Sequence, residues 1–279
     1  MSKVHQIVID KIIKKLEEGV IPWHCPWEYG LPKNLVSKKS YSGINLILLG
    51  MLPFQYPLYL TRNQVYKRDG SIKHGERSNL IVYYKPFNKR VEKIDEVTHE
   101  RYFENEKKFI LRYYSVYNIE QTSLPIPEFK KHDKIEACEK IIDSMPLKPI
   151  IIHKYQKAYY SPTKDMVNIP SYESFKEPEL YYNTLFHELI HSTGHQTRLD
   201  RDSISKEHAF GDTVYSKEEL IAELGSAFLC ANAGISAQTL NDSSAYLNGW
   251  LNVLRKRPQY LFSCSSKAKK ASDFILHEG

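Results

Sequence analysis

The sequence predicts an α+β fold divided into two domains. Apolar residues recur at helical spacing in both halves, and short β-prone runs separated by turn residues lie between them. The segment Leu124–Pro127 contains two prolines, which make it stiff, and it interrupts both patterns. We therefore expect one domain in residues 1–125 and another in residues 128–279, because 279 residues are enough for two ordinary domains with a core each.

The first domain is expected to begin with an amphipathic helix. Residues 2–18 carry apolar side chains at helical spacing, and Gly19 follows as a stop. A second apolar segment at residues 41–51 is also expected to be helical. Strands are predicted at residues 58–60, 80–84 and 112–119. The strongly charged residues 86–108 between the last two predict a mobile hairpin or loop.

The second domain is expected to combine helices with short strands. Residues 135–145 have a helical apolar stripe. Pro178 is expected to open a helix that ends near Gly194, because proline suits the first helical position. A further long helix is predicted from about Lys217 to Ala231. Strands are predicted at residues 149–152, 158–161 and 166–169.

The composition excludes several classes of protein. Hydrophobic residues make up 42% of the chain and charged residues 26%, so a mostly disordered chain is excluded. The longest apolar run, Ile44–Leu52, is far too short to span a bilayer, and the first residues lack the apolar stretch of a signal peptide. The widely separated cysteines predict neither a disulfide framework nor a cysteine zinc site. We therefore expect a cytoplasmic protein with no membrane partner.

The positive charge is concentrated in the first domain. The whole chain has a formal charge of +6, but residues 31–93 alone contain 12 lysines and arginines against three acidic residues, a net charge of +9. Residues 131–279 are close to neutral, with 18 basic and 19 acidic residues. This uneven distribution predicts that one part of the protein binds a polyanion and another part has a different task.

The most specific motif is the sequence HELIH at residues 187–191. On a helix, His187 and His191 project from one face one turn apart, so both imidazoles can bind one metal ion. Catalytic zinc sites use three such ligands and an open position for water, and Glu188 is placed to take a proton from that water. The alternative is a helix with two surface histidines. The apolar neighbours of the motif argue against it: Leu185, Phe186, Leu189 and Ile190.

A third zinc ligand is expected on the second long helix. The metzincin pattern fails, because Thr197 stands where its histidine would be. The sequence ELIAE, from Glu219 to Glu223, resembles gluzincin peptidases, in which the first acid binds zinc and the second supports a ligand histidine. The resemblance assigns these roles to Glu219 and Glu223. However, Ser216 and Glu219 also fit a capping box, and Glu223 would then be the ligand.

The expected chemistry is metal-assisted hydrolysis of a peptide bond. Glu188 would act first as a base and then as proton donor to the leaving amine. A further donor near the open position would stabilise an oxyanion. The sequence offers three candidates without selecting among them: His195, His208 and Tyr215.

The basic region also contains aromatic residues. A groove for single-stranded nucleic acid needs cations for the phosphates and aromatic faces for the bases. Aromatic residues in strands are often core residues, however, and scattered lysines often only keep a surface soluble. The candidates for DNA binding are Trp23, Trp27, Lys33, Lys38, Lys39, Tyr41, Arg62, Lys67, Arg68, Lys73, Arg77 and Lys85.

Several segments of the chain resemble the ArdC family of antirestriction proteins. In the first domain the resemblance rests on Gly19–Trp27, Tyr41–Asn45, Leu60–Gln64 and Lys73–Glu76. In the second it rests on His187–His195, Arg198–Leu199 and Glu218–Gly225. These segments follow the expected order over nearly the whole chain. Two features depart from the family: His24 and Cys25 replace a more basic pair, and residues 86–108 look like an insertion.

The resemblance implies a single-stranded DNA-binding domain joined to a zincin-like, gluzincin-type metallopeptidase domain with one Zn²⁺. It also implies protection of incoming plasmid, phage or integrative-element DNA from restriction endonucleases. The implied partners are single-stranded DNA and either a protein substrate or a host restriction enzyme. Two alternatives stay open. One is a regulatory metalloprotease that cleaves a DNA-bound repressor or host protein, and the other is a non-enzymatic DNA-binding module with structural zinc.

Overall fold

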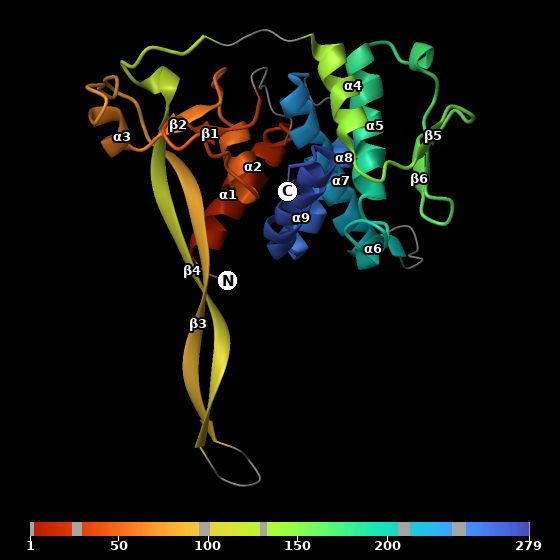
Figure 1. Cartoon of the computed structure of the whole chain (residues 1–279). Coiled ribbons are helices and arrows are strands. Elements are labelled where there is room, and N and C mark those ends of the chain that lie inside the picture. Colours follow the sequence, from red (N-terminus) through yellow and green to blue (C-terminus); the bar gives the residue numbers. More distant parts are fainter. Residues whose placement is uncertain are drawn as a thin grey trace.

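Two α+β halves lie side by side in the computed structural model, and a long two-stranded hairpin projects from the N-terminal half (Figure 1). The predicted fold class, α+β in two domains, is confirmed. The structure describes residues 3–23, 30–94, 101–128, 133–205, 213–235 and 244–278.

The N-terminal half is a four-stranded sheet with helices packed against it. The strand order is β1-β2-β4-β3, with β1 parallel to β2 and the other pairs antiparallel. The predicted N-terminal helix is present, and its apolar stripe is buried, with Val8 and Ile12 fully enclosed. The elements are α1 (Lys3–Glu17), β1 (Lys33–Asn34), α2 (Ile44–Gly50), β2 (Leu58–Leu60), α3 (Arg62–Tyr66), β3 (Asn79–Ile94), β4 (Arg101–Asn118) and the 3-10 helix η1 (Ile119–Gln121).

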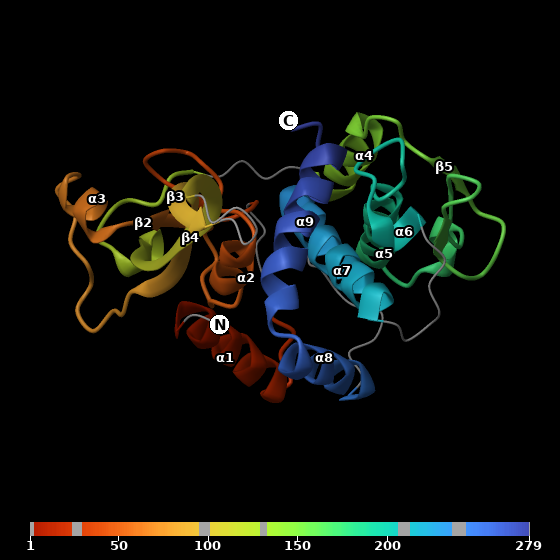
Figure 2. The same cartoon turned by 90° about the horizontal axis from the view of Figure 1, so that it is seen from below.

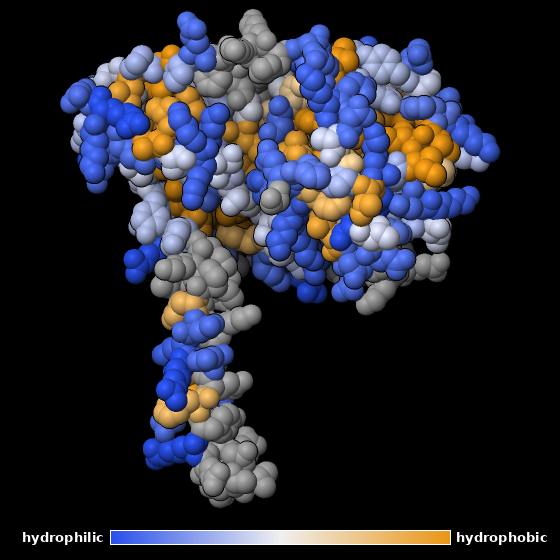
Figure 3. All heavy atoms as spheres, viewed as in Figure 1, coloured by the Kyte–Doolittle hydropathy of each residue, from blue (hydrophilic) through white to orange (hydrophobic). Residues whose placement is uncertain are grey.

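The hairpin of β3 and β4 contains the charged segment 86–108. The pairing continues without interruption from Asn79 opposite Val116 to Ile94 opposite Arg101. The prediction of a hairpin is thus confirmed, and the described part of the segment is strand because it extends both predicted strands outward. Further out along the projecting hairpin, exposed polar and apolar side chains lie next to one another (Figure 3).

Within the described residues, the C-terminal half packs five long helices and a short one beside a small sheet. The sheet has the order β5-β7-β6, which makes β6 an outer strand. No helix within the described residues is long and apolar enough to cross a membrane. The elements are α4 (Lys134–Ser144), β5 (Ile150–Ile152), β6 (Tyr159–Ser161), β7 (Met166–Asn168), the 3-10 helix η2 (Tyr172–Ser174), α5 (Pro178–Ser192), α6 (Asp202–Ser205), α7 (Thr213–Ala233), α8 (Ser244–Lys256) and α9 (Gln259–Ile275).

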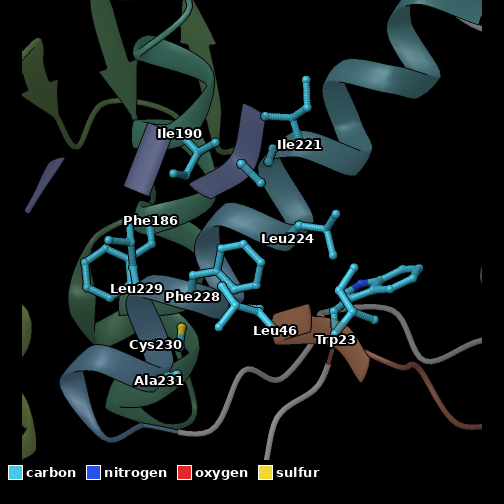
Figure 4. Packing of buried hydrophobic residues seen from close by; sticks show 14 of the residues in the cluster. Trp23, Leu46, Phe186, Ile190, Ile221, Leu224, Phe228, Leu229, Cys230 and Ala231 are labelled. Carbon is cyan, nitrogen blue, oxygen red and sulfur yellow. The ribbon is translucent and has the colours of Figure 1, made fainter. Parts of the chain in front are cut away.

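The two halves share a continuous hydrophobic core, whereas the sequence predicts a core for each. Trp23 and Leu46 lie beside Leu224 and Phe228 of α7 (Figure 4). The indole rings of Trp23 and Trp250 meet edge to face with their centroids 5.8 Å apart. Seen from below, α1 packs against α8, and α2 against α9 (Figure 2). The helices α5 and α7, which carry the predicted metal ligands, are therefore packed with the N-terminal half into one body.

Candidate metal centre

α5 carries both histidines of the HELIH motif. Pro178 occupies the start of this helix, as predicted, and most residues of its second half are buried. One turn separates His187 from His191, and their Nε2 atoms lie 3.1 Å apart. Because the apolar neighbours of both residues are enclosed in the core, the two imidazoles cannot swing freely into solvent.

Glu219 reaches the same point from α7. Its Oε2 lies 3.4 Å from His187 Nε2, and its Oε1 lies 3.5 Å from His191 Nε2. Ligands that bind one zinc ion tetrahedrally at about 2.0–2.1 Å are about 3.3 Å from one another. The three separations found here match that spacing, so the donor set fits a single divalent ion.

The start of α7 is relevant to the alternative that Glu219 caps this helix and does not bind the metal. The helix begins at Thr213 and not near Lys217, so Ser216 lies within its first turn and is not the N-cap. This position disfavours the capping-box role of Glu219, and the choice of Glu219 over Glu223 as ligand stays a prediction. Glu223 lies one turn beyond Glu219, and its charge acts on His187.

The carboxylates around His187 change its protonation. Burial alone would lower the pKa of this imidazole, but the hydrogen bond to Glu219 and the charges of Glu188 and Glu223 raise it to about 9. Such a concentration of negative charge also attracts a metal cation. His187 must release its proton before it can coordinate one.

Glu218 supports His191 from behind. Its Oε1 lies 3.4 Å from His191 Nδ1, the nitrogen that carries the proton when Nε2 binds a metal. Burial raises the pKa of Glu218, but hydrogen bonds from His191 and Arg201 outweigh that effect and hold the pKa at about 2. The carboxylate is thus ionised and able to fix the orientation of the His191 ring.

Arg201 holds this carboxylate in place. Its guanidinium donates to both oxygens of Glu218, at 2.5 and 3.1 Å, and to the hydroxyl of Thr193 at 2.6 Å. A further bond of 2.8 Å reaches the carbonyl of Ile190, near the end of α5. Ser203 also donates to Glu218. Arg201 therefore ties the end of α5 to the start of α7, where the ligands meet.

A cleft of about 320 Å³ opens over the three ligands. Glu188 lies in its wall, next to His187. The opposite wall belongs to β6 and includes Tyr159 and Tyr160. The Tyr160 hydroxyl donates to Asp165, and both burial and that carboxylate raise its pKa, so it stays protonated.

Of the three predicted oxyanion donors, the structure describes the side chain of His195 alone. His195 lies beyond the end of α5, where its Nδ1 is 2.8 Å from the Thr197 hydroxyl, and it does not line the cleft. His208 lies outside the described residues, as does the side chain of Tyr215, whose backbone is in α7. Both stay predictions.

The structure corrects one predicted DNA-binding residue. Trp23 is fully buried and packs on Trp250, so its ring is part of the core and cannot stack on a base. Tyr41 is half-buried against Tyr59. Trp27 lies outside the described residues.

Most predicted cations are on the surface, as binding to DNA requires. Lys33 is half-buried, and the side chain of Lys85 is not among those the structure describes. Arg62 lies over the ring of Tyr66 at 6.0 Å from its centroid. The exposed candidates are Lys38, Lys39, Arg62, Lys67, Arg68, Lys73 and Arg77.

Sequence reasoning missed Glu218, Arg201 and Tyr160. Glu218 precedes a predicted ligand, and only the packing of α7 on α5 shows that it faces His191. Arg201 follows the Arg198–Leu199 pair, but nothing in the sequence marks it as buried. Tyr160 lies in a predicted strand, whose position beside α5 is a tertiary feature.

Two family models match the two halves of the chain. Residues 2–117 match the N-terminal domain of the anti-restriction factor ArdC, and residues 136–267 match a zincin-like metallopeptidase domain. The chain belongs to the ArdC family. The two matches lie on either side of the predicted boundary at residues 125–128, whose position stays a prediction.

Solved structures of an ArdC protein have the same fold over almost their whole length. The metal-free antirestriction ArdC protein of plasmid R388 is 28% identical with a TM-score of 0.75, and the match covers 99% of this chain and 98% of that one. The Mn(II)-bound form has a TM-score of 0.74 at 26% identity, with the same coverage. The zincin-like domain and this metal-bound relative support a divalent metal in the ArdC-family domain found here.

Similarity also extends to longer proteins. The uncharacterized protein y4eC of Sinorhizobium fredii is 29% identical, and the match covers 98% of this chain and 92% of that protein. A DNA primase TraC of Escherichia coli is 30% identical over 98% of this chain. The match covers only 27% of that primase, and 20% of a second TraC primase that is 31% identical. The ArdC-like unit thus also occurs as one part of larger proteins.

Proposed function

We propose that this chain is an antirestriction protein that binds single-stranded DNA with its N-terminal half and hydrolyses peptide bonds at a zinc centre in its C-terminal half. The observation that carries the proposal is the convergence of His187, His191 and Glu219 beneath a cleft that also contains Glu188. Membership of the ArdC family supports the antirestriction role. We further propose that it acts in the cytoplasm, where incoming DNA meets host endonucleases.

One zinc ion is the metal we assign to the three ligands. Two imidazoles and a carboxylate are the ligands of many catalytic zinc sites. When bound, zinc would polarise the peptide carbonyl and lower the pKa of a bound water to about 7. Glu218 would keep His191 oriented, with the proton on its Nδ1.

Glu188 is the residue we assign to proton transfer. It is buried, next to a ligand, and on the wall of the cleft, so its carboxylate is close to where water and substrate would meet. There it would take a proton from the attacking water and pass it to the leaving amine. The open cleft disfavours a purely structural metal, because structural zinc sites are closed by four protein ligands.

An extended peptide is the substrate shape that the cleft favours. β6 is an outer strand of its sheet, and its residues Tyr159 and Tyr160 line the cleft. An outer strand can pair with the backbone of an extended peptide. That pairing would bring the scissile bond next to Glu188.

Single-stranded DNA is the partner we assign to the N-terminal half. Seven of the predicted cations are exposed there, and residues 31–93 have a net charge of +9. Exposed cations of this density bind phosphates, and the release of counterions would make that binding sensitive to salt. The similarity to proteins named DNA primase agrees with a role on DNA.

The substitution Glu188→Gln tests the enzymatic part of this proposal. It keeps the size of the side chain and removes its ability to accept a proton. We expect the variant to retain the metal and to bind a labelled single-stranded oligonucleotide as the wild type does, but to lose hydrolysis of a general substrate such as unfolded casein. Undiminished hydrolysis by Glu188→Gln would refute the assignment.

The same variant separates the alternatives in cells. The readout is transfer of an unmodified plasmid into restricting and non-restricting hosts. Loss of protection would make peptide hydrolysis part of the antirestriction role. Full protection by Glu188→Gln would instead favour a DNA-binding module in which the metal only stabilises the fold.

A further inference from the structure

A second and larger cleft lies between the two halves of the molecule. Its volume is about 840 Å³, and it shares none of its described lining residues with the metal centre. α2 lies between the base of the hairpin and α9 at this place (Figure 2). Both halves therefore contribute to the lining, which includes His5, Ser42, Tyr83, Phe262, Lys269 and Lys270.

Aromatic rings lie on both walls of this cleft. Tyr83 of β3 is 46% exposed, and its ring meets Tyr114 of β4 edge to face at 5.8 Å. On the other wall, Phe262 of α9 packs edge to face on His5 of α1 at 4.5 Å. Rings that are held by a neighbour and remain accessible suit the stacking of an unpaired base.

The charge of the cleft is positive. None of the described residues that line it is acidic, whereas Lys269 and Lys270 both face it. Lys269 forms an ion pair with Asp273, one turn further along α9. Lys270 is exposed, and Arg112, which is opposite Tyr83 on the same face of the hairpin, is exposed as well.

We propose that this cleft binds single-stranded DNA, with a base stacked on Tyr83 and the backbone phosphates next to Lys270 and Arg112. The inference rests on the proposed function and extends it, because it places part of the DNA site in the C-terminal half, whose overall charge is near neutral. The exposed cations around Lys67 and Arg68 would then attract the DNA. The cleft would hold the unpaired strand beside the peptidase half.

The test uses the full-length protein and a fluorescently labelled oligo(dT) strand in an anisotropy titration. Loss of one stacked base weakens binding by about 5-fold to 150-fold, so this is the effect expected for Tyr83→Ala. Tyr83→Phe keeps the ring and should bind like the wild type. Tyr155→Ala is the matched control, because Tyr155 is similarly exposed, at 49%, but does not line the cleft.

Lys270→Ala gives an independent measurement that does not depend on the hairpin. The slope of log affinity against log salt should become shallower by about 0.7, the value for one phosphate contact on a single strand. Lys256→Ala, an exposed lysine of α8, should leave the slope unchanged. An oligonucleotide with 5-iodouracil should crosslink to Tyr83 or Phe262, as located by mass spectrometry.

Two failures can be told apart. If the wild type does not bind the single strand at all, the proposed function itself fails. If it binds, but Tyr83→Ala and Lys270→Ala bind equally well and the crosslinks lie elsewhere, the cleft is not the DNA site and the proposed function stands. Thermal melting of each variant confirms that the proteins compared are folded.

Discussion

The metal centre and the basic surface of the N-terminal half differ in how their side chains are held. In the metal centre, His191 is supported by Glu218, and Glu218 is fixed in turn by Arg201. On the basic surface, residues such as Lys67 and Arg68 are exposed. The first region fixes the geometry of a few atoms, whereas the second provides charge without a fixed arrangement.

This difference explains why one region was easier to predict. Two histidines four residues apart on a helix must share a face, so local geometry alone brings His187 and His191 together. A DNA-binding surface depends on which side chains the tertiary fold leaves exposed. Trp23 illustrates the point, because it is an aromatic residue beside the basic region in the sequence, but the fold buries it completely.

The largest effect on stability is expected from Trp23→Ala. Replacing a fully buried tryptophan by alanine should lower the free energy of unfolding by about 3–5 kcal/mol, because it leaves a cavity where the two halves meet. Urea unfolding measures this. Among the molecules that remain folded, DNA affinity should not change, and a stable variant with weakened DNA binding would instead make Trp23 a contact residue.

The next largest effect is expected on metal affinity, when the support of His191 is removed. Glu218→Gln removes the charge that orients the imidazole and leaves Arg201 buried without its carboxylate. The affinity for the metal should fall by about 10-fold to 100-fold, as is typical when such a supporting group is lost. Competition with a chromophoric chelator measures the change. Ser203→Ala removes one hydrogen bond to the same carboxylate and serves as the milder control.

A smaller effect, on stability, is expected where α5 and α7, the helices that carry the metal ligands, pack against each other. A Cβ atom added at Gly225 of α7 would lie 2.6 Å from Cδ1 of Ile190 on α5, so Gly225→Ala should push the two helices apart. We expect a loss of about 1–3 kcal/mol in the free energy of unfolding, the usual cost of overpacking. The double variant Gly225→Ala/Ile190→Val should recover part of it, and no recovery would place the strain elsewhere.

The smallest effect, a change in DNA affinity, is expected from single substitutions on the basic surface. Lys67→Ala and Arg68→Ala should each weaken DNA binding a few-fold and make the salt slope shallower by about 0.7, without changing stability. Titrations at several salt concentrations measure this. Lys140, an exposed lysine that pairs with Glu136 in the other half, provides the control substitution to alanine.

Much of the fold follows from the sequence, but α8 and α9, which lie beyond the last predicted helix, do not. The buried face of α9 consists largely of small or polar residues, among them Cys264, Ser265, Ala268 and Ser272. Nevertheless it packs along α7 near the middle of the molecule. Close packing of two helices requires small side chains, and a hydrophobicity pattern does not reveal them.

The residues that support the metal ligands also could not be predicted from the sequence, because their roles depend on tertiary packing. The sequence offers Glu219 or Glu223 as the third ligand and gives the adjacent Glu218 no role. The register between α5 and α7 places Glu219 beside both Nε2 atoms and Glu218 behind His191. That register depends on long-range packing, and local spacing does not encode it.

Metal analysis of purified Glu219→Gln and Glu223→Gln tests the central claim most directly. Both substitutions remove one carboxylate charge from α7, one helical turn apart, and so they form a matched pair. With His187, His191 and Glu219 as the ligands, the wild type and Glu223→Gln should retain a single divalent metal ion, and Glu219→Gln should lose it. Metal retained by Glu219→Gln and lost from Glu223→Gln would contradict the account.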